Sequence, residues 1–214
     1  MRYHSLSSCL VVLLPLLSIV SSLPAKGDQM LAVKPATVFS PYLDRIRQTL
    51  PPNFAMRLPT QIRLGEPADE AVIEQFKIRV FASGVTPGLT VGLYTCEDVT
   101  QFCLVGTFSV AHSHSAIARR EFSLHQAAAT PITLTNQIQG YLLEGSKRLP
   151  PSLFSSVMWQ QDQMLYNISF ASPERQNMLY MAVSMANSQP IASLNPELRD
   201  APPGAAPASL TRQH

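Results

Sequence analysis

Several features that mark common functional classes are scarce in this sequence. Only 9 of the 214 residues are glycine, so the glycine-rich loops that hold phosphate groups have few places to occur. Charged residues make up 14% of the chain, the formal net charge is +2, and no run of like charges is long enough for a nucleic-acid-binding arm. The composition, with 46% hydrophobic residues, is otherwise that of an ordinary globular protein. It excludes a collagen, a coiled coil and a wholly disordered chain, and it disfavours a nucleic-acid partner.

Motifs that identify the large enzyme classes are absent as well. The sequence contains no G-x-x-x-x-G-K-[ST], G-x-G-x-x-G, H-E-x-x-H, G-x-S-x-G or S-x-x-K. An acidic cluster between Glu66 and Glu74 could supply paired carboxylates for glycoside hydrolysis. That chemistry needs aromatic platforms, however, and aromatic residues make up only 7% of the chain. The balance favours a protein that is not an enzyme and carries no cofactor.

Residues 1–22 have the order of a secretory signal peptide. Arg2 supplies a positive charge, residues 9–20 form an apolar run, and small residues follow up to Ser22. The run has 12 residues and contains Pro15, whereas a helix needs about 20 residues to cross a bilayer. We expect cleavage after Ser22, export to the periplasm or the extracellular space, and no permanent transmembrane span. A protein tethered through an uncleaved N-terminus is the alternative.

Two cysteines remain after this cleavage, Cys96 and Cys103. In an oxidising compartment such a pair predicts a disulfide. If the two face each other across a hairpin, the register also pairs Leu89 with Val110, Val91 with Phe108 and Tyr94 with Val105. This register gathers Leu89, Val91, Leu93, Phe108 and Val110 on one face of the sheet. The other face would then carry Thr90, Gly92, Tyr94, Thr107 and Ser109.

Composition divides the mature chain into three parts. Residues 23–38 are expected to be a leader or spacer, residues 39–189 a single domain, and residues 190–214 a disordered tail rich in proline and alanine. The expected fold class is α+β: a twisted antiparallel sheet packed by a C-terminal helix, with one hairpin disulfide. Helical periodicity predicts helices over 41–49 and about 173–187, the second with an apolar stripe of Leu179, Ala182, Val183 and Ala186.

Alternation of apolar and polar residues predicts the strands. The expected strands beyond the disulfide hairpin cover residues 76–82, 116–124, 132–134 and 139–143. A second hairpin is expected over 155–170, with its turn at Gln161 and Asp162. Its cross-strand pairs would be Trp159 with Met164 and Val157 with Tyr166.

The segment from Ile132 to Ala186 resembles a known type of protein module. It reads ITLTNQIQGYLLEG, then VMWQQDQMLYNISF, then SPERQNMLYMAVSMA. This order is similar to a C-terminal module of uncharacterised extracytoplasmic bacterial proteins, with cyanobacterial secreted proteins nearest in style. The resemblance covers about a quarter of the chain and implies an α+β module exposed in the cell envelope, with no known chemistry.

These observations lead to two functional hypotheses. The first is an exported, non-enzymatic module of the cell envelope that binds a protein partner or a small apolar ligand. A hollow between the sheet and the final helix, lined by Val157, Trp159, Tyr166 and Leu179, would favour an apolar ligand, whereas a filled core would favour interaction through the surface. The alternative is a metal-dependent enzyme that uses His112, His114 and His125, with Glu121 as a possible further ligand.

Overall fold

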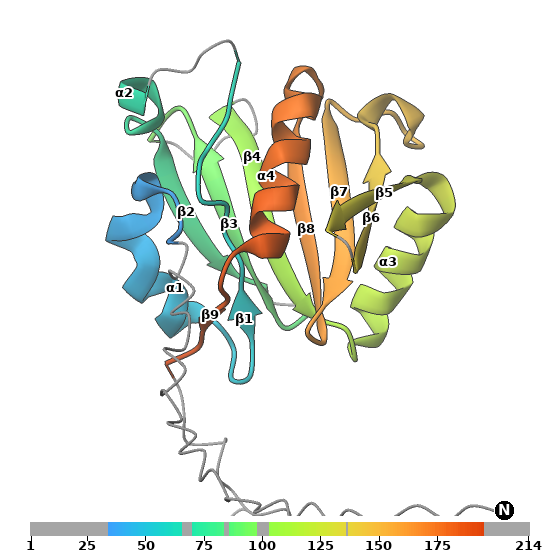
Figure 1. Ribbon diagram of the computed structural model, residues 1–214, viewed down its shortest axis with the longest axis horizontal. Coiled ribbons are helices and arrows are strands. Elements are labelled where there is room, and N and C mark those ends of the chain that lie inside the picture. The colour runs from blue at the N-terminus through green and yellow to red at the C-terminus, as the bar shows by residue number, and fades with distance from the viewer. Residues whose placement is uncertain (1–33, 66–69, 84–85, 98–102, 136, 195–214) are drawn as a thin grey trace, which may run out of the picture. The chain divides into compact units, whose positions relative to one another are not determined.

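The computed structural model describes residues 34–65, 70–83, 86–97, 103–135 and 137–194 (Figure 1). The expected signal peptide lies outside these ranges, as do Glu66 and Asp69 of the acidic cluster. Within them, the chain folds as a mixed structure of helices and antiparallel strands, which confirms the α+β prediction.

A seven-stranded sheet with every neighbouring pair antiparallel organises the domain. The order of its strands across the sheet is β2-β3-β4-β8-β7-β6-β5. Because each strand pairs mainly with a neighbour close in sequence, short turns make most of the connections, and only the β4–β8 pair is distant in the chain. The strands are β2 (Lys77–Ala82), β3 (Gly88–Tyr94), β4 (Leu104–His112), β5 (Thr130–Thr135), β6 (Ile138–Leu143), β7 (Phe154–Gln161) and β8 (Met164–Ala171).

One face of the sheet, here called the front face, is covered by the C-terminal helix α4 (Arg175–Asn187) (Figure 1). The same core receives the 3-10 helix η1 (Thr37–Tyr42), helix α1 (Leu43–Thr49), and a two-stranded sheet of β1 (Ala55–Met56) and β9 (Ile191–Ala192). The remaining short helices are α2 (Glu70–Ile73), η3 (Gly145–Lys147) and η4 (Ser172–Glu174). In the described ranges, none of the helices has both the length and the apolar character that crossing a bilayer requires.

Methionines make up most of the buried stripe of α4, which differs from the stripe expected from the sequence. Val183 is exposed and Leu179 is only partly buried. The buried side chains follow the i, i+3, i+4 spacing of one helix face: Met178, Met181, Ala182, Met185 and Ala186. Flexible thioether chains fit the irregular surface of a twisted sheet better than the shorter branched ones, because methionine has more rotatable bonds.

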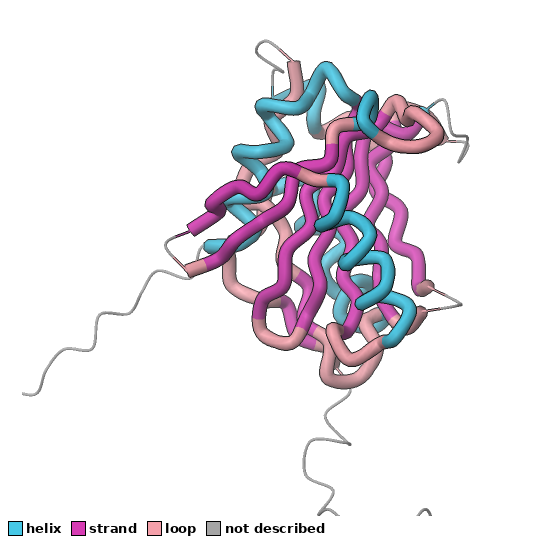
Figure 2. The backbone as a smooth tube through the Cα atoms, turned by 90° about the vertical axis from the view of Figure 1, so that its right-hand side faces the viewer, coloured by secondary structure: helices cyan, strands magenta, loops and turns pink. Residues whose placement is uncertain are grey.

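The opposite or back face of the sheet is partly covered by α3 (Ala116–Ala128), and the strand expected over 116–124 was a wrong prediction. Ser115 caps the helix, its hydroxyl accepting a hydrogen bond from the Ala118 amide at 3.4 Å. Ala118, Phe122 and His125 are buried, a spacing of four and three that belongs to a helix. Figure 2 shows the strands lying between helical segments. Apolar and polar residues alternate only over 121–124, at the end of this segment, and so short a pattern does not exclude a helix.

The disulfide hairpin has the register predicted from the cysteines along most of its length. Val91 pairs with Phe108 and Leu89 with Val110, and all four side chains are buried on the front face. Cys96 and Cys103 form the disulfide, with their Cα atoms 5.7 Å apart. A bulge after Leu93 shifts the last pair, so Tyr94 faces Leu104 and the expected pair with Val105 was wrong.

The second hairpin pairs its strands two positions further along than predicted. Trp159 faces Tyr166 and Val157 faces Ile168, so the expected pairs with Met164 and Tyr166 were wrong. The turn consists of Asp162 and Gln163, whose φ angles of 49° and 64° are typical of a type I′ turn. A shift of two residues preserves the alternation of faces, which explains why the predicted core side of the hairpin is still the observed one.

The ordered domain also extends beyond both expected boundaries. At the N-terminal side, the Ala36 amide donates to the Pro59 carbonyl at 2.9 Å, inside the segment assigned to a spacer. At the C-terminal side, Ile191 is buried and pairs with Met56 in the small sheet, inside the segment assigned to the tail. The N-terminal boundary was predicted from proline, glycine and the lack of a sustained period, and the C-terminal one from proline, alanine and serine without an aromatic residue. Neither criterion detects the single apolar side chains that attach these ends to the core.

Candidate functional site

The space between the sheet and α4, where a ligand cavity was considered, is occupied by side chains. Val157, Trp159 and Tyr166 are fully buried, and Leu179 packs against the same core at its edge. The rings of Trp159 and Tyr166 stack with their centroids 5.4 Å apart. The inward-facing methionines of α4 belong to this continuous cluster. The four residues considered as lining a ligand therefore pack as core.

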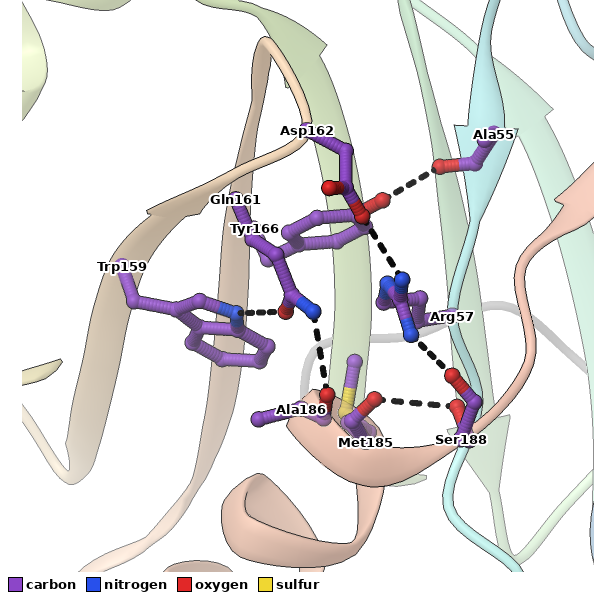
Figure 3. A network of polar contacts seen from close by, with 9 residues as sticks. All are labelled: Ala55, Arg57, Trp159, Gln161, Asp162, Tyr166, Met185, Ala186 and Ser188. Atoms are coloured by element: carbon purple, nitrogen blue, oxygen red, sulfur yellow. Dashed lines mark hydrogen bonds and ion pairs between the residues drawn. The ribbon is translucent and has the colours of Figure 1, made fainter. Parts of the chain in front are cut away.

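The polar atoms of these two aromatic residues are used in internal hydrogen bonds (Figure 3). Trp159 Nε1 donates to Gln161 Oε1 at 3.3 Å, and Gln161 Nε2 donates in turn to the Ala186 carbonyl at 3.1 Å. Tyr166 Oη donates to the Ala55 carbonyl at 2.8 Å. Burial raises the pKa of Tyr166 to about 12, so the hydroxyl keeps its proton at neutral pH. Both residues are held by the fold and leave no polar group for a ligand.

Arg57 extends this network to the turn of the β7–β8 hairpin (Figure 3). Its guanidinium is buried, forms an ion pair with Asp162 at 2.7 Å, and donates from Nη1 to the Ser188 carbonyl just beyond α4. The cation thus lies at the C-terminal end of α4, where the helix dipole is negative. The Ser188 hydroxyl donates to the Met185 carbonyl at 2.9 Å. The arrangement fastens β1, the hairpin turn and the end of α4 to one another, which is a structural role.

The three histidines considered as metal ligands are not brought together. His112 and His114 stack at the end of β4 with their ring centroids 4.7 Å apart. His125 instead lies on α3, with Nε2 2.8 Å from the Tyr141 carbonyl oxygen. Glu121 lines a groove beside α3. In the part of the chain that the structure describes, there is no group of three or more His, Cys, Asp or Glu side chains placed to hold a metal ion.

A groove of about 330 Å³ opens on the back face of the sheet, beside the first turns of α3. Because α3 packs on Ala111, Tyr141, Met158 and Leu165, it covers the β6, β7 and β8 part of this face and the end of β4, and leaves β3 and the rest of β4 open. We call this feature the sheet groove. Its floor is Thr90, Ser109 and Asn167, and its walls include Ile117, Ala118, Glu121, Met158 and Leu165.

The floor of the sheet groove is a single cross-strand row of short polar side chains. Thr90 pairs with Ser109, and Ser109 pairs with Asn167. The two hydroxyls satisfy each other at 2.9 Å. Asn167 differs, because its Oδ1 is buried and has no hydrogen-bond partner among the described residues. A buried amide oxygen left unpaired costs about 1–3 kcal/mol, so this atom is a natural acceptor for a donor that enters from outside.

The sheet groove therefore combines an unpaired acceptor with an apolar wall. Among its described lining residues Glu121 is the only ionisable one, and its side chain is exposed at the wall on α3. A second buried oxygen without a partner, Ser156 Oγ, lies on the same back face in β7. This chemistry suits a ligand that offers N–H donors together with apolar surface, such as a peptide segment. It provides neither a nucleophile paired with a base nor a set of metal ligands.

Sequence reasoning did not find the sheet groove. The prediction placed Thr90 and Ser109 correctly on the non-core face of the first hairpin. It assigned the wall to a strand, however, and a strand over 116–124 would have built no raised edge beside them. The signal that could have revealed the wall is Ser115 followed by Ala118 and Phe122, which is a capping residue before apolar residues at helical spacing.

Comparison with models of protein families, with curated proteins and with solved structures finds no match to this chain.

Proposed function

We propose that the protein is an exported, non-enzymatic module of the cell envelope that binds a protein partner through the sheet groove. The disulfide supports an oxidising compartment, because thiols in the cytosol are generally kept reduced. Burial of the candidate ligand-lining residues within a packed core favours recognition at the surface over carriage of a small apolar molecule inside the domain.

The single observation that carries this proposal is the unpaired Oδ1 of Asn167 in the floor of the groove. An apolar or hydroxyl side chain would fit this strand position without leaving a buried polar atom unpaired. Asn167 therefore lowers the stability of the isolated domain. A backbone or side-chain N–H from a partner would satisfy it once the Asn167 amide turns toward the groove. The exposed Ile117 and the partly buried Met158 would pack against the rest of the bound segment.

Site-specific photocrosslinking in the cell envelope tests the proposal. A photoreactive amino acid at Ile117, which lines the groove and is 45% exposed, is expected to give one defined protein adduct. Leu124 is the matched control, because it lies on the same helix, is 64% exposed and does not line the groove. The same label at Leu124 is expected to give no such adduct.

The replacement Asn167→Leu separates specific binding from chance proximity. It has nearly the same size but removes the acceptor, so the yield of the Ile117 adduct is expected to fall by about ten-fold or more. Circular dichroism of the purified variant verifies that the fold is intact. Identical adducts at Ile117 and Leu124, no adduct at either position, or an unchanged yield in Asn167→Leu would each contradict the proposal.

A further inference from the structure

The two most exposed leucines of the described chain lie four positions apart on one loop. Leu149 is 98% exposed and Leu153 is 82% exposed. They belong to residues 147–153, here called the leucine loop, which joins η3 to β7 at the upper right of Figure 1. The leucines border an open groove of about 760 Å³ whose lining also includes Leu104, Phe154 and Ala171. Large apolar side chains held this far into water commonly mark an interaction surface.

Hydrogen bonds at the base of the leucine loop hold its backbone in place. The Gly145 carbonyl accepts from the Arg148 amide at 3.2 Å and from the Ser152 amide at 2.9 Å. The Gly145 amide donates to the buried Ser155 hydroxyl at 3.1 Å. At the far end, the Leu153 carbonyl accepts from the Ser172 amide at 2.8 Å. Since both ends are pinned to the sheet, the exposure of the leucines follows from the loop geometry.

The backbone of this loop has few N–H groups that lack a hydrogen-bond partner within the protein. Pro150 and Pro151 at the tip have no N–H, and the amides of Lys147, Arg148 and Ser152 are already bonded within the protein. Burying an unpaired N–H in an apolar medium costs several kcal/mol, so a tip with few free donors enters such a medium more easily. This property fits a lipid environment better than strand addition to a protein, which would use backbone donors.

Three basic side chains lie in the leucine loop or next to its first turn. Lys147 and Arg148 precede Leu149, and Arg175 at the start of α4 shares the carboxylate of Glu144 with Lys147. Glu144 pairs with Lys147 at 3.2 Å and with Arg175 at 3.1 Å. With Glu174, which directly precedes Arg175, these three cations and two anions leave a local excess of one positive charge, which complements an anionic surface.

We propose that the leucine loop docks the domain on the surface of an anionic lipid membrane. Leu149 and Leu153 enter the boundary between headgroups and acyl chains, while Lys147, Arg148 and Arg175 contact the anionic headgroups. The contact is peripheral and does not require a membrane-spanning segment. The loop is distinct from the sheet groove, so this inference does not depend on the proposed partner binding.

Flotation of the exported chain with lipid vesicles tests this inference. The protein is expected to float with vesicles of phosphatidylcholine containing phosphatidylglycerol, and less with vesicles of phosphatidylcholine alone. Leu149→Ser with Leu153→Ser should lower the partition coefficient by roughly ten-fold for each leucine. Lys147→Gln with Arg148→Gln should lower it by roughly five-fold for each charge, and only on the anionic vesicles.

Leucines elsewhere on the surface provide the matched control. Leu124 and Leu194 are 64% and 54% exposed, and neither belongs to the leucine loop. Leu124→Ser with Leu194→Ser removes the same number of exposed leucines and is expected to leave vesicle binding unchanged. All variants carry the same N-terminus, so any contribution of that end is constant.

A fluorescence measurement establishes whether the loop enters the lipid. Leu149→Trp is expected to shift its emission to the blue on anionic vesicles and to be quenched by brominated lipid, whereas Leu124→Trp should show neither effect. Trp159 is fully buried in the core and provides a constant background. Absence of vesicle binding, equal binding by the two double-leucine variants, or equal quenching at positions 149 and 124 would overturn the inference.

Discussion

The carboxylate of Asp162 lies 2.7 Å from the guanidinium of Arg57, although the two residues are 105 positions apart in the chain. Arg57 follows the short strand β1, and Asp162 forms the turn between β7 and β8. The ion pair is asymmetric, because the Arg57 side chain is 9% exposed while that of Asp162 is 62% exposed. The two partners should therefore contribute unequally to stability.

Replacing Arg57 is expected to be the more damaging of two changes at this pair. Arg57→Met removes the hydrogen bond to the Ser188 carbonyl as well as the ion pair, and should lower the free energy of unfolding by about 2–3 kcal/mol. Asp162→Asn keeps a polar partner at an exposed position and should cost about 1 kcal/mol or less. Urea unfolding of both variants measures the difference. A larger loss in Asp162→Asn would contradict this assignment of the network.

The disulfide should stabilise the domain, but the strands of the sheet should still pair without it. Cys96 and Cys103 close a short loop at the end of the β3–β4 hairpin. By the chain-entropy estimate, Cys96→Ser with Cys103→Ser should lower the free energy of unfolding by about 2–3 kcal/mol. The far-ultraviolet circular dichroism should remain that of the native protein, because the paired core residues Val91 and Phe108 are unaffected. Loss of the native spectrum at neutral pH would show that the hairpin depends on the bridge.

Stability should fall as the pH drops from about 7 towards 5, and His125 should contribute to that fall. Burial lowers the pKa of His125 below its usual value of 6.5, although the hydrogen bond to the Tyr141 carbonyl acts in the opposite direction. The unfolded chain consequently takes up a proton near pH 6.5, before the folded chain does, and acid favours unfolding. Burial and the neighbouring His114 lower the pKa of His112 in the same direction.

The variant His125→Gln isolates this contribution. Glutamine retains a donor for the Tyr141 carbonyl but does not titrate, so the free energy of unfolding of the variant should vary less between about pH 7 and pH 5. Chemical unfolding at a series of pH values provides the measurement. An unchanged pH dependence would mean that the histidine is already solvated in the folded protein.

Asn167→Leu should make the isolated protein more stable while it weakens partner binding. The substitution removes the buried Oδ1 that has no partner and extends the apolar surface next to Leu165 and Met158. A gain of about 1 kcal/mol is expected in the free energy of unfolding. Thr90→Val with Ser109→Val is a useful comparison, because those two hydroxyls bond to each other and should yield no such gain. Destabilisation by Asn167→Leu would indicate that the amide has a structural role.

The cross-strand register could be predicted for the first hairpin and not for the second, for a physical reason. In the first, the pair Cys96 and Cys103 supplied a register, and the alternation of Leu89 and Val91 with Thr90 supported it. In the second, only composition suggested the turn, and the left-handed conformations of Asp162 and Gln163 leave no strong signal because neither is glycine. The face of each residue was nevertheless correct, since it depends on the parity of its position and an error of two positions preserves that parity.

Local patterns in the sequence determined the α+β class, the disulfide, and which side chains of the first hairpin enter the core, because period-two alternation and a cysteine spacing are encoded within a few residues. Only the tertiary structure decided that residues 116–128 form a helix on the back face and that Asn167 is left without a partner. It also decided that Arg57 meets Asp162 and that the leucine loop is held away from the core. These features depend on which surfaces remain after distant segments have packed, and no short stretch of sequence contains that information.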